Sequence, residues 1–218
     1  MKEDYGTGRR ARLWTEFAVL FLLVPVCHVS YFEILGPFLP LAAVFALAFV
    51  LLAVTPGFRW REMVEVRGLA RHLPLIAGLL VVCIGVTTAL VLALRPWVFL
   101  GFPTRAPSRF ALVIALYPFL SALGQEVAYR LLFFRRYRGL FRNDATAIVA
   151  SAFVFALAHA FYQNWVAVSL SFVGGLVFAW AYVRSGSFML AWILHTLAGW
   201  TIFTVGLGVY FYHGAIPG

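Results

Sequence analysis

Apolar stretches long enough to cross a lipid bilayer recur along almost the whole of this 218-residue chain. A helix needs about 20 apolar residues to span the hydrocarbon core. We expect seven such helices, at residues 13–32, 38–55, 73–94, 110–134, 145–163, 165–184 and 187–211. Charged residues make up only 11% of the chain, whereas a soluble domain carries about 25%. The sequence therefore predicts an all-α polytopic transmembrane bundle of about seven spans, with eight as the alternative.

The distribution of charge predicts one transmembrane domain between two short tails. We expect residues 1–12 to form a basic cytoplasmic tail and residues 13–212 to form the transmembrane domain, with its motif-bearing core at about 110–200. Residues 213–218 would form a short C-terminal tail. Arginines are concentrated in alternate loops, which places the N-terminus in the cytoplasm by the positive-inside rule. Because this topology accounts for the net charge of +9, no nucleic-acid partner is expected.

Two local features of the predicted spans concern helix packing. Pro118 lies within the fourth span and is expected to bend it, since proline cannot donate the hydrogen bond that a helix interior requires. The adjacent pair Gly174 and Gly175 lies in the sixth span, where small residues allow two helices to approach closely.

Ionisable side chains inside three of the spans are the most informative polar residues. The stretch LSALGQEVAYRLLFF, residues 120–134, places Glu126 shortly before the run of arginines that begins at Arg135. At a rise of about 1.5 Å per residue, Glu126 lies about 15 Å from the cytoplasmic surface, and His159 and His195 lie at similar depths. A charged group at the centre of a membrane helix costs about 2.5–3.5 kcal/mol on insertion scales, so we expect these residues to be functional.

One carboxylate and two imidazoles at matched depth suggest two routes to amide hydrolysis. In the first route, Glu126 together with a histidine takes a proton from water, and the second histidine donates to the oxyanion that forms. In the second route, Glu126, His159 and His195 hold a zinc ion and leave its fourth position open to water. Arg130 lies one helical turn after Glu126 and is expected to pair with it.

The motifs around these residues resemble those of the CPBP family of intramembrane proteases, which includes the CAAX prenyl endopeptidases and their bacterial Abi-type relatives. The family pattern is EExxxR, then FxxxH, then HxxxN or HxxxD, on three helices. This chain has QEVAYR at 125–130, FALAH at 155–159 and HTLAG at 195–199. The resemblance covers about residues 110–200. It implies a helical endopeptidase, in the inner membrane of a bacterium, that acts on a membrane-anchored protein or peptide.

The resemblance also implies a role for each matching residue. Glu126 and His159 would activate water, and His195 would stabilise the oxyanion. Three further residues are expected to support them, by positioning water or substrate, by keeping the glutamate ionised and by packing the site: Gln125, Arg130 and Phe155. A mechanism of this glutamic type needs no cofactor, whereas the metallopeptidase alternative would use zinc on the three catalytic residues.

Two departures from the family pattern leave a second function open. Gln125 stands in place of the first glutamate, and an amide cannot act as a general base. Gly199 stands in place of Asn or Asp, which removes one partner of the oxyanion. The alternative is therefore a catalytically impaired family member that acts as a membrane binding, immunity or scaffold protein. A small transporter is a third hypothesis, although the chain lacks the internal repeat that many transporters have.

Overall fold

The computed structural model describes residues 7–36 and 38–211. Residues 1–6 of the expected N-terminal tail and the whole expected C-terminal tail, 213–218, lie outside the described part. Every regular element of the described part is helical, which confirms the all-α prediction. The α-helices are α1 (Thr7–Ala18), α2 (Val24–Ser30), α3 (Phe32–Leu35), α4 (Phe38–Ala53), α5 (Leu73–Leu94), α6 (Gly101–Arg105), α7 (Pro107–Tyr117), α8 (Leu123–Glu126), α9 (Asp144–Leu157), α10 (Trp165–Ser185) and α11 (Phe188–Val205). Short π-helical and 3₁₀ segments connect several of them into longer continuous helices.

Helices long enough to cross a membrane confirm the predicted polytopic bundle. Six stretches of the described residues have the required length and hydropathy: Thr7–Ser30, Leu69–Leu94, Pro107–Leu140, Asp144–Tyr162, Trp165–Ser185 and Phe188–Val205. The remaining predicted span, at residues 38–55, corresponds to α4, whose apolar part is shorter, over Leu39–Ala53. The chain is therefore an integral membrane protein.

Two spans extend beyond the apolar runs from which they were predicted. The first helix begins at Thr7 rather than at residue 13, and Arg12 forms an ion pair with Glu16 one turn further along it. Glu16 accepts a hydrogen bond from Arg12, at 2.9 Å, and two from Arg136, at 2.8 and 3.0 Å. The fourth span runs over Pro107–Leu140 rather than over 110–134, so Arg136 is itself part of a helix that packs on α1.

Capping residues determine where the last three long helices begin. The side chain of Asn143 accepts from the backbone N–H of Thr146 in a capping box at the start of α9. Asn164 and Ser187 cap α10 and α11 in the same way. Gly186, with a φ of 68°, ends α10 in the left-handed conformation that favours glycine. These short connections hold α9, α10 and α11 as neighbours.

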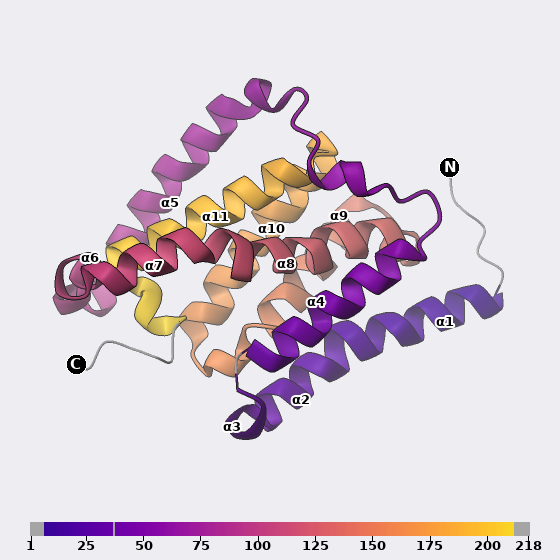
Figure 1. The fold of residues 1–218 in the computed structure, drawn as a ribbon, viewed down its shortest axis with the longest axis horizontal. Helices are drawn as coiled ribbons and strands as arrows, with labels where there is room; N and C mark the ends of the chain where they lie inside the picture. The colour runs from indigo at the N-terminus through magenta and orange to yellow at the C-terminus, as the bar shows by residue number, and fades with distance from the viewer. Residues whose placement is uncertain (1–6, 37, 212–218) are drawn as a thin grey trace.

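The helices of the second half form the centre of the bundle (Figure 1). α10 packs against both α9 and α11, and the continuous helix that contains α7 and α8 crosses α11. A Cβ atom added to Gly175 would lie 3.0 Å from the Cα of Ala152, so this glycine permits the close approach of α10 to α9, as expected. α5 lies against α11 at one edge, while α1 and α4 cover the helix that follows α8.

Candidate active site

The helix that carries the first motif is not a regular α-helix. From Pro118 to Ala122 it is π-helical, and after the single α-helical turn of α8 it is π-helical again over Val127–Tyr137. Pro118 has no N–H, so it cannot donate to the carbonyl of Ile114 as a helical residue would. The indole of Trp200 on α11 donates to that carbonyl instead, at 2.9 Å. The expected irregularity at Pro118 is thus a π-helical segment, and such segments are frequent at functional sites.

Glu126 lies at the centre of a fully buried charge cluster. Its side chain has no exposed surface, and its Oε1 accepts a hydrogen bond from Nδ1 of His195 at 2.9 Å. Its Oε2 lies 3.3 Å from Nε of Arg130, which confirms the ion pair expected from the spacing of the two residues. Glu126 therefore contacts two of the expected site residues and is shielded from every aqueous surface.

Arg130 is held by contacts on several sides. It is fully buried, and its Nη1 donates to the carbonyl of Tyr129 and to the hydroxyl of Ser151, both at 3.1 Å. The guanidinium lies 5.0 Å from the ring centre of Phe155 and 5.8 Å from that of Phe178. Such cation–π contacts stabilise a desolvated charge. This environment fixes Arg130, and through it Glu126, in one position.

His195 presents one ring nitrogen to the glutamate and the other side of its ring to a cavity. Because Nδ1 donates to Glu126, Nε2 is the nitrogen left for substrate or water. The imidazole stacks on Phe178, with ring centres 4.9 Å apart and an angle of 15° between the planes. His195 is one of the residues that line the cavity.

His159 lies just beyond the end of α9 and faces the same cavity. Its Nδ1 bonds to the carbonyl of Phe155 at 2.8 Å, which again leaves Nε2 for a ligand. The ring of Phe155 contacts both histidines edge-on, at 4.6 Å from His159 and 5.5 Å from His195. Phe155 therefore packs against both imidazoles.

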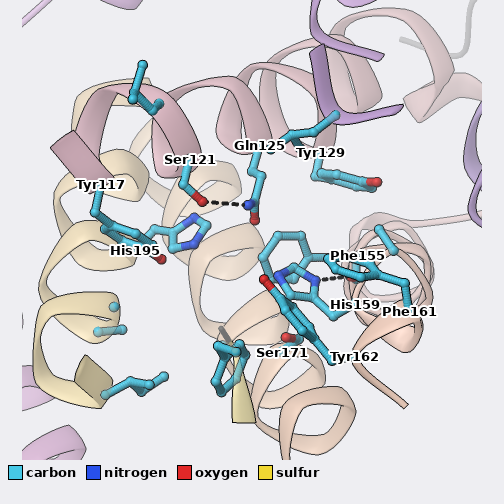
Figure 2. A pocket seen from close by; sticks show the side chains of 18 of the residues that line it. Tyr117, Ser121, Gln125, Tyr129, Phe155, His159, Phe161, Tyr162, Ser171 and His195 are labelled. Carbon is cyan, nitrogen blue, oxygen red and sulfur yellow. Dashed lines mark hydrogen bonds between the residues drawn. The ribbon is translucent and has the colours of Figure 1, made fainter. Parts of the chain in front are cut away.

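Gln125, rather than Glu126, reaches the cavity. Its Nε2 donates to the hydroxyl of Ser121 at 3.0 Å, while its Oε1 is buried and has no hydrogen-bond partner in the described part of the structure. Gln125 lines the cavity and Glu126 does not. In Figure 2, Gln125 projects between His195 on one side and His159 on the other.

The cavity has a volume of about 560 Å³ and a mainly apolar wall. Residues of α2, α4, α7, α8, α9, α10 and α11 contribute to it, so it lies between these helices. Exposed lining residues such as Leu112 and Leu120 show that it is open to the surface. Its polar groups gather around Gln125, His159 and His195, whereas apolar side chains such as Leu112 and Leu116 line other parts of it. No Asp, Glu, Lys or Arg of the described residues is part of the wall.

The three residues expected as zinc ligands do not form a metal-binding group. Within residues 7–36 and 38–211, no cluster of three or more His, Cys, Asp or Glu side chains could hold a metal ion. The two carboxylate oxygens of Glu126 face Arg130 and His195, and Nδ1 of His159 faces a backbone carbonyl. We therefore assign no step of the reaction to a metal.

The comparisons with known proteins agree with the motifs. Residues 107–201 match a family model described as type II CAAX prenyl endopeptidase, Rce1-like. No curated protein and no solved structure matches the chain. The matched segment begins with α7, ends within α11 and contains all three motifs. The part of the chain that builds the candidate site, residues 107–201, is therefore similar to the Rce1-like family of type II CAAX prenyl endopeptidases.

Proposed function

We propose that this protein is an intramembrane endopeptidase that hydrolyses a peptide bond in a membrane-anchored protein or peptide. One observation carries the proposal: Gln125, His159 and His195 converge on one apolar cavity within membrane-spanning helices, and Glu126 is hydrogen-bonded behind His195. A mainly apolar cavity with a few convergent polar groups is typical of a ligand site. The proposed location is the bacterial inner membrane, with the N-terminus in the cytoplasm.

In the proposed reaction, His159 acts on the attacking water. Its Nε2 accepts a proton from the water, while the unpaired Oε1 of Gln125 accepts the other hydrogen and orients the molecule. The water oxygen attacks the carbonyl carbon of the substrate, and the C–N bond then breaks. The proton taken by His159 goes to the nitrogen of the leaving amine. No cofactor takes part in these steps.

His195 and Glu126 would act on the opposite side of the carbonyl group. As an imidazolium, His195 donates from Nε2 to the oxygen on which negative charge develops. The Glu126 carboxylate, 2.9 Å from Nδ1, stabilises this charged form and fixes the orientation of the ring. In this proposal Glu126 acts through His195 rather than on the water directly, because it is fully buried and lies behind the cavity wall.

Hydrolysis can be tested with the purified protein in liposomes that also contain solubilised bacterial membrane proteins. Mass spectrometry would identify new C-termini over time for the unchanged protein, Glu126→Gln and His159→Gln. His159 acts as the general base, a role that contributes about 10²–10⁴-fold. Glu126 orients His195, and loss of a carboxylate with this role costs about 10⁴-fold in a serine protease triad. Each variant should therefore lose at least about 100-fold in rate. Glu33→Gln, on an exposed residue of α3, is the matched control and should keep the full rate. Unchanged product formation by both site variants would refute the mechanism.

A second candidate function is a catalytically impaired family member that binds a membrane peptide, as an immunity or scaffold protein would. The observation in its favour is that an amide, Gln125, occupies the cavity wall and no carboxylate of the described residues does. The same assay with Gln125→Glu separates the two functions. Product from the unchanged protein supports the protease, whereas product from Gln125→Glu alone supports the impaired form.

A further inference from the structure

Tyr117 fills the space that a side chain at position 199 would occupy. Gly199 is buried on α11, and a Cβ atom added to it would overlap the ring and the hydroxyl oxygen of Tyr117. A side chain at position 199 and the ring of Tyr117 therefore cannot occupy this space together, because any side chain at 199 would displace the tyrosine. The chain lacks Asn or Asp at this position and has a phenol from another helix in its place.

Two hydrogen bonds from α11 hold α7 so that Tyr117 faces Gly199. The indole of Trp200 donates to the carbonyl of Ile114, and the indole of Trp192 donates to the carbonyl of Pro118 at 2.8 Å. Tyr117 lies between these two carbonyls in the chain. Because Pro118 cannot donate to the carbonyl of Ile114, the bond from Trp200 supplies a donor to that carbonyl.

The phenol of Tyr117 is placed beside His195 on the cavity wall. Both residues line the cavity, and their rings meet edge-on with centres 6.0 Å apart (Figure 2). Phe203 also packs against the phenol, with ring centres 5.6 Å apart. His159 lies across the cavity from this pair, with Gln125 between them. A hydroxyl here can reach a ligand that also contacts Nε2 of His195.

We propose that Tyr117 is the second catalytic hydrogen-bond donor of the site and replaces the side chain that is absent at Gly199. This inference rests on the proposed hydrolase function. The Oη–H of Tyr117 donates to the carbonyl oxygen of the scissile bond while His195 donates to the same oxygen, and Tyr117 keeps its proton throughout. Two donors aimed at one oxygen stabilise the negative charge of the tetrahedral intermediate.

The test compares Tyr117→Phe, which removes only the hydroxyl, with Tyr31→Phe, a matched change on an exposed tyrosine outside the cavity. The assay is the liposome assay of new C-termini, with rates taken at several concentrations of membrane protein. Loss of one oxyanion donor lowers kcat by about 10²–10³-fold. We expect this loss for Tyr117→Phe with little change in KM or in thermal unfolding, whereas Tyr31→Phe keeps the full rate.

A double substitution at positions 117 and 199 tests whether a side chain at 199 can restore the rate that is lost without the tyrosine. Gly199→Asn alone should unfold at a lower temperature, because its side chain overlaps Tyr117. The double change Tyr117→Ala with Gly199→Asn relieves the overlap and should be at least tenfold faster than Tyr117→Ala. Tyr117→Phe within twofold of the unchanged rate would overturn this inference alone. An unchanged protein that forms no product would overturn it together with the proposed hydrolysis.

Discussion

Replacement of Arg130 by methionine should be among the most destabilising single changes in this protein. Its Nε lies 3.3 Å from the Glu126 carboxylate, and both side chains are fully buried. At an effective dielectric constant of about 20, two unit charges at this distance attract by about 5 kcal/mol. Removal of one partner of a buried pair costs about 3–5 kcal/mol, because the other charge stays buried without compensation. We therefore expect Arg130→Met to lower the free energy of unfolding by about 3–5 kcal/mol.

Unfolding in detergent, followed by circular dichroism against added denaturing detergent, would measure this loss. Arg142→Met, at an exposed arginine of the loop before α9, is the control and should change stability by less than about 0.5 kcal/mol. The double change Glu126→Gln with Arg130→Met removes both charges and should recover most of the loss. A loss for Arg130→Met as small as the control, or a double change that is worse than either single change, would refute the reasoning.

Three further substitutions test the helix contacts by the same unfolding measurement. Gly124→Ala should cost about 1–3 kcal/mol, because its Cβ would overlap the ring of Phe45 on α4. Gly175→Ala should lower the free energy of unfolding by less than Gly124→Ala, since its Cβ would lie 3.0 Å from the Cα of Ala152 on α9 rather than overlap a ring. Unchanged stability would contradict this close contact. Trp200→Phe should cost about 1–3 kcal/mol by leaving the carbonyl of Ile114 unpaired, and a neutral effect would show that the carbonyl has another partner.

The sequence alone could indicate three residues of the candidate site, because ionisable groups inside apolar spans are rare. Matched depth on three helices pointed to Glu126, His159 and His195. The structure places Glu126 in direct contact with His195, while the ring of Phe155 packs against both histidines. The ion pair with Arg130 followed from helical spacing alone.

The direction of each side chain could not be predicted in the same way. Adjacent helical residues point about 100° apart, so either Gln125 or Glu126 could have faced the cavity. The rotation of this helix depends on its π-helical segments and on packing against α4 and α11, which no residue pattern indicates. Ser151 was not identified from the sequence as a partner of Arg130, although it is a polar residue within an apolar span. The sequence gives no indication that Tyr117 lies at the candidate site, because tyrosine is common near membrane surfaces.

The most direct test of the account is hydrolysis in water labelled with heavy oxygen. The liposome assay would be run in this water, and the new C-termini would be weighed by mass spectrometry. The account predicts that each new terminal carboxylate carries one heavy oxygen atom and that His195→Gln, which cannot donate as an imidazolium, forms at least 100-fold less of this product. Equal labelled product from the unchanged protein and from His195→Gln, or no labelled product from either, would contradict it.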